Sequence, residues 1–212
     1  ENGELLATGC NEVPARGGGL PWPGTDFDPR DFNRGYDTNT RIRLESINEL
    51  LGSLQRAGWL NEDLAKLTPS ELTQRIEMDN QLRFKETRIG NLIEFGRVVH
   101  AEMNALLDAG RRGIATAGSV LFCTTYPCHM CARHIIAAGI QKVVYIEPYQ
   151  KSLATEIYDD MISDSQESSQ KVYFQSFRGV APRFFMNAFR KKGARKDDSG
   201  DAVRWDARSA SL

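Results

Sequence analysis

From residue 98 onward, short apolar segments alternate with segments whose apolar residues recur at helical spacing. The helical pattern covers residues 100–109, 128–138, 151–161 and 183–190, and the strand pattern covers residues 119–124, 142–146 and 171–177. Pro127 precedes the second of these helices and Gly139 follows it, as expected at helix boundaries. Alternation of strands and helices in this way favours an α/β layered fold.

The first 24 residues add one more strand and a loop. Asn2-Gly3 is a hairpin signal with no strand before it, so we expect this chain to be a piece of a longer protein. Residues 5–10 are predicted to form a short buried strand. Residues 11–24 hold three glycines in a row and three prolines, which predicts a loop.

Residues 25–95 are predicted to be a helical insertion. One amphipathic helix is expected over residues 40–57. Thr68-Pro69-Ser70-Glu71 is a capping box, and a second helix should run from it to about residue 84. The insertion would interrupt a single domain of residues 1–190, and residues 191–212 are predicted to be a disordered tail.

Composition excludes several classes of protein. The 27 basic and 28 acidic residues give a formal charge of -1, which argues against a surface that binds a nucleic-acid polymer. No apolar run approaches the ~20 residues that a membrane span needs. Four cysteines in 212 residues are too few for a disulfide scaffold, so we expect a cytoplasmic protein.

The chemistry is concentrated in His100-Ala101-Glu102 and in Pro127-Cys128-His129-Met130-Cys131. A His-x-Glu followed by Pro-Cys-x-x-Cys is typical of zinc-dependent deaminases. Cys128 and Cys131 lie three residues apart, on one face of the first turn of a helix. The helix dipole stabilises their thiolates there. With His100 as the third ligand, one position of a zinc tetrahedron stays open for water.

Glu102 is the predicted proton carrier of this site. It lies two residues after His100, so both side chains converge only if they stand at the start of a helix. Bound zinc lowers the pKa of its water to about 7. Glu102 would take the proton of this water and return it to the ring nitrogen and to the leaving ammonia.

Other interpretations of the cysteines remain open at this point. Cys-x-x-Cys alone is also found in thioredoxin-like redox sites and in structural zinc sites. Cys10 and Cys123 do not have the spacing that would complete a structural site, and we expect both to pack as small residues. His129 and His134 are expected to be ordinary helix residues.

The sequence from about residue 5 to 146, apart from the insertion, resembles the cytidine and deoxycytidylate deaminase superfamily. The resemblance implies a three-layer α/β/α fold with a central five-stranded mixed sheet, and a strand and a helix upstream of Glu1. Nucleoside deaminases of this superfamily usually have cysteine where this chain has His100. Histidine at this position resembles the motif of nucleotide deaminases, tRNA adenosine deaminases or polynucleotide deaminases.

Three segments narrow the resemblance. The sequence His-Ala-Glu-Met-Asn-Ala at residues 100–105 is similar to the corresponding motif of the deoxycytidylate deaminases within the superfamily. Residues 147–154 and 177–183 resemble the deaminase half of bacterial antiphage dCTP deaminases, which deplete dCTP. In those proteins a P-loop NTPase domain precedes the deaminase. No P-loop motif occurs in this chain, so that domain is expected upstream.

The resemblance also implies substrate contacts. Asn11 is expected to contact the sugar, and Thr124, Thr125 and Tyr126 are expected to line the base pocket. Ala101 and Pro127 are further candidates for substrate contact. Phosphates are expected to meet backbone amides of Gly18 and Gly19, with Lys151 as a further candidate. Residues 25–95 contain no cysteine or histidine, so a second, structural zinc is not expected there.

These arguments predict a zinc-dependent hydrolytic deaminase of dCMP or dCTP that forms a homo-oligomer. Its partner is a small nucleotide, with neither a nucleic-acid polymer nor a membrane expected. The first alternative is a deaminase of RNA, such as a tRNA adenosine deaminase. The second is a regulatory or assembly module in which zinc has only a structural role.

Overall fold

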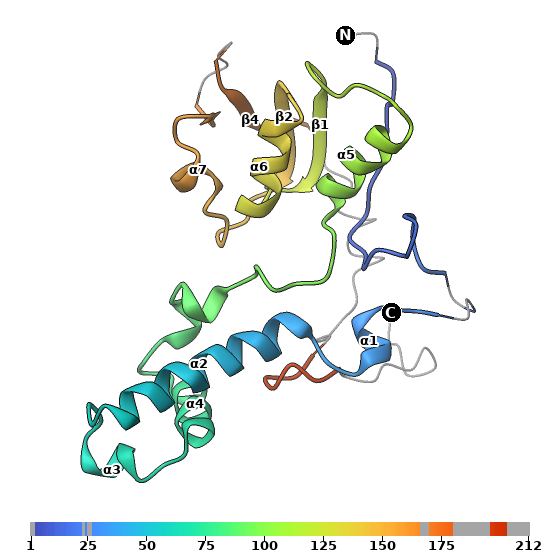
Figure 1. The fold of residues 1–212 in the computed structure, drawn as a ribbon. Coiled ribbons are helices and arrows are strands. Elements are labelled where there is room, and N and C mark those ends of the chain that lie inside the picture. The colour runs from blue at the N-terminus through green and yellow to red at the C-terminus, as the bar shows by residue number, and fades with distance from the viewer. Residues whose placement is uncertain (1–2, 23, 25–26, 166–169, 180–195, 203–212) are drawn as a thin grey trace. The chain divides into compact units, whose positions relative to one another are not determined.

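The computed structural model describes residues 3–22, 24, 27–165, 170–179 and 196–202 of the chain. The chain divides into two compact units, which Figure 1 colours along the sequence. We call Glu1–Leu20 with Val98–Lys191 the sheet unit, and Pro21–Arg97 with Lys192–Leu212 the helical unit. The sheet unit is therefore assembled from two stretches that are separated in sequence by most of the helical unit.

Four strands form the sheet among the described residues. They are β1 (Val120–Thr125), β2 (Lys142–Glu147), β3 (Ile162–Ser163) and β4 (Val172–Ser176). The spatial order is β1-β2-β4-β3, and every neighbouring pair is parallel. Leu121 pairs with Val143, which pairs with Phe174, so these side chains share one face of the sheet. Val143 and Phe174 are fully buried, so the core lies on this face.

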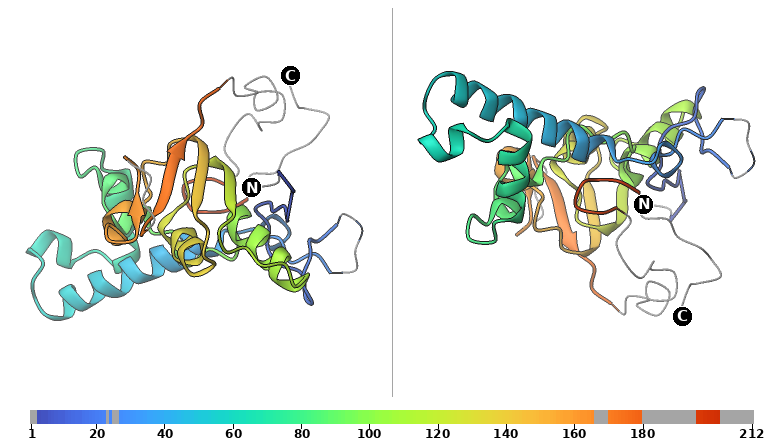
Figure 2. Two further views of the ribbon diagram at one scale, coloured as in Figure 1. Left: turned by 90° about the horizontal axis from the view of Figure 1, so that it is seen from above. Right: turned by 90° about the horizontal axis from the view of Figure 1, so that it is seen from below.

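Helices α5 (Ala101–Arg111) and α6 (His129–Ala137) lie on the same side of the sheet (Figure 1 and Figure 2). The buried positions of α6 and its N-cap are Cys128, Cys131, Ala132 and Ile135. Their spacing of three and four residues makes one apolar stripe along the helix. The hydrophobic pattern therefore predicts both the helix and the face that it buries.

The fifth strand and the mixed sheet that the resemblance implied are not found among the described residues. Residues 5–10, predicted to be a buried strand, have no strand assignment, and the Leu5 side chain is 77% exposed. A strand is stable only when a neighbour takes up its backbone hydrogen bonds, and no described strand pairs with residues 5–10. Nearby, Glu12 and Val99 form an isolated antiparallel bridge.

The predicted three-layer arrangement appears in part. One layer of helices, α5 and α6, covers the face that carries Val143. The opposite face of β1 is exposed among the described residues, with Phe122 73% and Val120 45% exposed. The further helix predicted over residues 183–190 lies outside the described residues.

The helix predicted over residues 151–161 is limited to α7 (Ala154–Ile157). The chain turns after Tyr158, and Ile162 enters β3 opposite Val172 of β4. Ile162 is buried in that position. Pairing with a neighbouring strand thus outweighs the helical pattern of this segment, because helix propensity is a weak preference beside tertiary burial.

In the helical unit, α2 (Thr38–Arg56) packs against α4 (Pro69–Met78), and each helix has a buried apolar side chain, Ile47 in α2 and Leu72 in α4. Thr68 and Glu71 form the predicted capping box at the start of α4. This helix ends at Met78 rather than near residue 84. The remaining elements of the unit are α1 (Asp31–Arg34), α3 (Glu62–Ala65) and the 3-10 turns η1 (Phe84–Glu86) and η2 (Ile89–Asn91). No described helix is long and apolar enough to cross a membrane.

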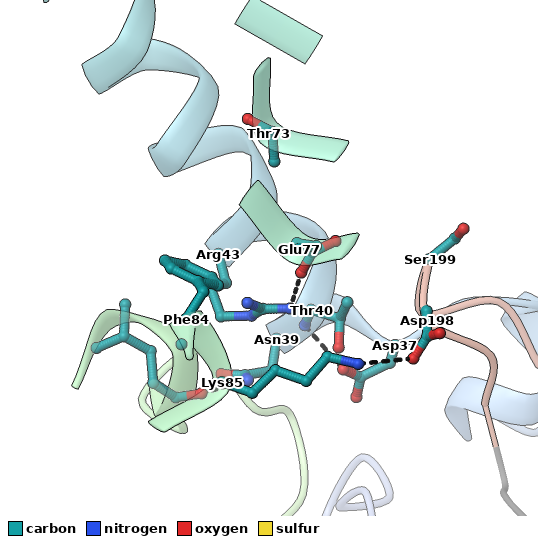
Figure 3. Close-up of polar contacts among 12 residues, drawn as sticks. Asp37, Asn39, Thr40, Arg43, Thr73, Glu77, Phe84, Lys85, Asp198 and Ser199 are labelled. Carbon is teal, nitrogen blue, oxygen red and sulfur yellow. Dashed lines mark hydrogen bonds and ion pairs between the residues drawn. The ribbon is translucent and has the colours of Figure 1, made fainter. Parts of the chain in front are cut away.

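Polar contacts join α2 to its neighbours within the helical unit, and Figure 3 shows several of them. Arg43 and Glu77 form an ion pair of 2.9 Å between α2 and α4, and their side chains are only 11% and 14% exposed. Thr73 of α4 donates a hydrogen bond of 2.5 Å to Oδ1 of Asn48. The two helices are therefore held by buried polar groups as well as by apolar packing.

Part of the stretch predicted to be a disordered tail contacts the start of α2. Nζ of Lys196 lies 2.6 Å from Oδ2 of Asp37 and 2.7 Å from Oγ1 of Thr40. The backbone N–H of Asp37 donates to the carbonyl of Gly200 at 2.9 Å. We call this contact the clasp, formed by residues 196–202 on the N-terminal end of α2. Polar composition suggested disorder, but it did not reveal these specific partners.

Candidate metal centre

His100 and Cys128 occupy the N-cap positions of α5 and α6, and Cys131 lies in the first turn of α6. Both N-cap residues have an extended backbone, and neither side chain caps its own helix. Serine or aspartate at such a position would bond to the free N–H groups of the helix. These three side chains face one another instead, and we call them the ligand cluster.

The geometry of the ligand cluster fits zinc. Nδ1 of His100 lies 3.3 Å from Sγ of Cys128 and 3.3 Å from Sγ of Cys131. Zn–S bonds of ~2.3 Å and Zn–N bonds of ~2.0–2.1 Å at a tetrahedral angle would place nitrogen and sulfur about 3.5 Å apart. Three protein ligands leave a fourth position for water or substrate, as in catalytic zinc sites.

The two thiols of the cluster differ in acidity. A hydrogen bond from the Cys131 thiol, opposed by burial, lowers the pKa of Cys128 to about 4. The same hydrogen bond, together with burial, raises the pKa of Cys131. The hydrogen bond with Cys128 also raises the pKa of His100, although burial opposes it. Zinc must therefore displace protons to bind, which makes its affinity dependent on pH.

Glu102 lies beside the ligand cluster. It is the second residue of α5, and its Oε2 is 3.6 Å from Sγ of Cys131. The first turn of α5 thus brings the carboxylate to the place where the ligands meet. Burial raises the pKa of Glu102, because removal from water disfavours its charged form. A carboxyl group whose neutral form is favoured in this way can donate a proton as well as accept one.

The end of β1 places the predicted base-pocket threonines on opposite faces of the sheet. Thr125 shares the helix-covered side with Cys123, because alternate residues of a strand point the same way. Burial, with the charge of Glu102, raises the pKa of Cys123, which fits a position close to the cluster. Thr124 is exposed on the other face, so the structure does not bring it to the cluster.

Tyr126 and Pro127 follow β1 and have structural contacts. The ring of Tyr126 packs on the rings of Tyr145 and Phe174, with centroids 4.8 Å and 5.4 Å apart, so it belongs to the core. Pro127 is buried, and its carbonyl accepts a hydrogen bond of 2.7 Å from Ser152. The Ser152 contact had no signal in the sequence, because it depends on how two loops meet.

Asn11 and Ala101 lie together at the start of α5. The backbone N–H of Ala101 donates to Oδ1 of Asn11 at 2.8 Å. Asn104, which the sequence argument did not select, donates from Nδ2 to the carbonyls of Cys10 and Val99 at 2.6 Å and 3.2 Å. Its spacing of one helical turn from His100 is the signal that could have identified it.

The predicted phosphate-binding residues are not gathered at the cluster. Gly18 and Gly19 have positive φ, at 88° and 85°, in a turn beside the guanidinium group of Arg111. Arg111 ends α5, about 15 Å along the helix from its first residue at ~1.5 Å per residue. The glycine turn therefore lies near the end of α5 that is remote from His100.

Lys151 is exposed, and no described hydrogen bond or ion pair joins it to the ligand cluster. A nearer neighbour is Tyr149, which the sequence argument did not select. Burial, and then the charge of Cys128, raises the pKa of Tyr149. Tyr149 therefore lies within electrostatic reach of the cluster.

The other histidines and cysteines of the chain lie outside the ligand cluster. Within the described residues, the ligand cluster is the one group of three or more potential metal ligands, and neither His129 nor His134 belongs to it. Cys10, expected to pack in the interior, is exposed. Its carbonyl is fixed by Asn104 while its side chain faces away from the core.

Comparisons with known proteins match the chain to one family. The family described as "Cytidine and deoxycytidylate deaminase zinc-binding region" matches residues 1–147. ComE operon protein 2 of Bacillus subtilis is 46% identical over 54 residues, which are 26% of this chain and 29% of that protein. Deoxycytidylate deaminase of Enterobacteria phage T2 is 44% identical over 54 residues, also 26% of this chain and 29% of that protein. The matches thus span less than a third of each relative.

Among solved structures, dCMP deaminase from the cyanophage S-TIM5, in complex with dCMP and dUMP, is similar to part of the chain. The two sequences are 28% identical, and the match covers 41% of this chain and 59% of that chain. The TM-score is 0.32.

Proposed function

The chain belongs to the cytidine and deoxycytidylate deaminase family through its zinc-binding region, and on this premise we propose that it deaminates deoxycytidine nucleotides by hydrolysis. The observation that carries this proposal is the convergence of Glu102 with His100, Cys128 and Cys131. Three zinc ligands, an open fourth position and a half-buried carboxyl group are the parts that hydrolytic deamination needs.

The proposed reaction consumes water and releases ammonia, as the C4–N4 bond of cytosine breaks and a C4–O bond forms. When bound, zinc lowers the pKa of a water molecule and makes it nucleophilic near pH 7. Glu102 accepts one proton from the attacking water at Oε2 and delivers it to the ring nitrogen. It then takes the second proton of that water, now on the oxygen bonded to C4, and delivers it to the amino group, which leaves as ammonia. The raised pKa of Glu102 suits this exchange, because the carboxyl group must both accept and donate a proton.

Two observations support a nucleotide as substrate rather than a nucleic-acid polymer. The formal charge of -1 provides no basic excess for a polymer backbone. The phage T2 relative is named a deoxycytidylate deaminase. We therefore propose dCMP, dCTP or both as substrates, with Asn11 at the sugar and Thr125 at the base.

A narrower proposal is antiphage defence by depletion of dCTP. Its support is the resemblance of residues 147–154 and 177–183 to bacterial antiphage dCTP deaminases. The same resemblance supports an upstream P-loop domain, and we propose that the full protein forms a homo-oligomer. These statements concern the whole protein and are separate from the chemistry of the zinc site.

The test is a substrate panel with the longest form of the protein, loaded with zinc. Ammonia release is measured with dCMP, dCTP, deoxycytidine and a tRNA. We expect turnover of at least one deoxycytidine nucleotide. Glu102→Gln should retain zinc and lower kcat by about 10²–10⁴-fold, the usual contribution of a general acid–base group. The matched control is Glu62→Gln, an exposed position in α3, which should leave kcat unchanged.

Unchanged ammonia release by Glu102→Gln would show that the proposed mechanism is wrong. Zinc-loaded protein that turns over none of the cytosine nucleotides would refute the proposed activity and favour a regulatory module. Turnover of tRNA alone would favour the RNA deaminase alternative. Comparing dCMP with dCTP decides which phosphate state is preferred.

A further inference from the structure

Asn104 connects the two chain segments that meet at the start of α5. It lies in the first turns of the helix, four residues after His100, and its side chain is half-buried. One Nδ2 group donates to the carbonyl of Cys10 at 2.6 Å and to the carbonyl of Val99 at 3.2 Å. Val99 directly precedes the ligand His100, and Cys10 directly precedes Asn11.

Further hydrogen bonds join the same two segments. The backbones of Glu12 and Val99 bond to each other in both directions, at 3.2 Å and 2.9 Å. Oδ1 of Asn11 accepts the N–H of Ala101 at 2.8 Å. Because this N–H belongs to the first turn of α5, no carbonyl within the helix is available to it, and Asn11 supplies the acceptor.

Gly9 shows how closely the first segment approaches α5. A Cβ atom at Gly9 would lie 2.1 Å from the carbonyl oxygen of Ala101 and 2.5 Å from the backbone nitrogen of Ala105. Both contacts are shorter than van der Waals contact, and both are with backbone that cannot move aside easily. The segment of residues 9–12 is therefore fixed against the first turn of α5 by steric fit as well as by hydrogen bonds.

We propose that Asn104 is a positioning residue for the zinc site. By bonding two carbonyls it holds residues 9–12 against the helix start, and it fixes the backbone that carries His100. The carboxamide suits this role because both partners are acceptors, and its Nδ2 group carries two N–H donors that can bond both. Neither carbonyl is a metal ligand, so Asn104 acts through the orientation of His100 and Asn11.

The test measures metal binding, which does not depend on deamination. Protein stripped of metal is titrated with Co²⁺, and the visible absorption of the tetrahedral thiolate complex gives both affinity and geometry. Asn104→Asp keeps the size of the side chain but replaces N–H donors by oxygen. We expect it to weaken Co²⁺ binding by about 10- to 100-fold, as for other groups that orient metal ligands. Asn104→Ala removes the donors without adding charge and should weaken binding in the same direction.

Asn91→Asp is the matched control. Nδ2 of Asn91 also donates to two backbone carbonyls, those of Lys85 and Thr87, but in the helical unit. The Asn91→Asp variant loses the same kind of hydrogen bonds as Asn104→Asp, and it should leave the Co²⁺ affinity and the absorption spectrum unchanged. Urea unfolding of all variants identifies any that fail to fold, in which case the milder Asn104→Ala provides the comparison.

The Co²⁺ titration does not depend on the proposed function, which the substrate panel tests separately. If Asn104→Asp and Asn104→Ala fold and bind Co²⁺ with the affinity and spectrum of the original chain, the positioning role is refuted. If Asn91→Asp weakens binding equally, the effect is a general loss of stability, and the role is again refuted. If the Asn104 variants alone weaken binding while the original chain deaminates no nucleotide, the positioning role stands and the proposed function fails.

Discussion

Ser152 donates a hydrogen bond from Oγ to the carbonyl oxygen of Pro127 at 2.7 Å, and so links the loop before α7 to the residue before Cys128. The same Oγ accepts the N–H of Ala154 at 3.2 Å, in the first turn of α7. One hydroxyl group of Ser152 therefore bonds both to the loop before α6 and to the first turn of α7. The position of Cys128 at the start of α6 depends on the loop that Ser152 fixes.

We predict that Ser152→Ala lowers the free energy of unfolding by about 1 kcal/mol, because the buried Pro127 carbonyl loses its donor. It should also weaken zinc binding, since Cys128 follows that carbonyl. Urea unfolding and a zinc titration measure the two effects. The control is Ser46→Ala, whose exposed hydroxyl bonds to the carbonyl of Ile42 at 2.9 Å and should change neither quantity. Equal unfolding midpoints for all three proteins would contradict the prediction.

Removal of one zinc ligand should abolish tight zinc binding. We predict that His100→Ala weakens zinc affinity by more than about 100-fold, a larger effect than the loss of a group that only orients a ligand. Zinc should raise the melting temperature of the original chain, because it binds the folded state, and it should not raise that of His100→Ala. His134→Ala changes an exposed histidine of α6 outside the cluster and should leave zinc binding intact. Loss of zinc from His134→Ala would show that the ligands are wrongly assigned.

The ion pair between Arg43 and Glu77 should contribute to the stability of the helical unit. Both side chains are largely buried, so Glu77→Gln leaves a charged guanidinium group without its counter-ion. We expect a loss of about 1–3 kcal/mol in the free energy of unfolding. Glu45→Gln breaks the exposed pair with Arg41, whose side chains are 59% and 57% exposed, and should cost less than ~0.5 kcal/mol. Similar losses in both variants would mean that burial does not set the strength of these pairs.

Local signals in the sequence identified the ligand cluster and most helices. His100, Cys128 and Cys131 follow from the His-x-Glu and Pro-Cys-x-x-Cys motifs taken together, and the three-residue spacing of the two cysteines is a local signal that puts both on one face of a helical turn. The capping box at Thr68 fixed the start of α4 for the same reason. What spacing did not reveal is that His100 and Cys128 are themselves the N-caps, with the helices beginning one residue later.

Features that depend on distant partners could not be predicted. The apolar residues at positions 5–10 suggested a strand. A strand also needs a neighbour to bond with its backbone, and none of the described strands pairs with this segment. The sequence predicted a helix up to residue 161, but Ile162 pairs with Val172 of β4 and the segment before it turns out of the helix. Thr124 and Thr125 are consecutive residues of β1, so their side chains point to opposite faces of the sheet. Their adjacency in the sequence does not show this. The contacts of Asn104 and Ser152 likewise depend on segments 94 and 25 residues away.

The clasp between Lys196 and Asp37 should stabilise the start of α2 in a pH-dependent way. Burial raises the pKa of Asp37, but hydrogen bonds from Lys196 and Thr40 together outweigh it, so the pKa lies below that of an ordinary aspartate. A carboxyl group with a lowered folded-state pKa stabilises the fold above its unfolded pKa of about 3.9, and the contribution is lost as pH falls through the folded pKa.

We therefore predict that Lys196→Ala lowers the free energy of unfolding by about 0.5–1 kcal/mol at pH 7, the range for a partly exposed pair at a helix start. The difference between variant and original should shrink as the pH falls from the unfolded pKa of about 3.9 through the lowered folded pKa of Asp37. Urea unfolding from pH 3 to 7 measures both effects. Lys66→Ala is the control, because Lys66 pairs with Asp63 at the surface, with side chains 72% and 90% exposed. A Lys196→Ala deficit that is the same at pH 3 as at pH 7 would show that the charge of Asp37 does not hold the clasp.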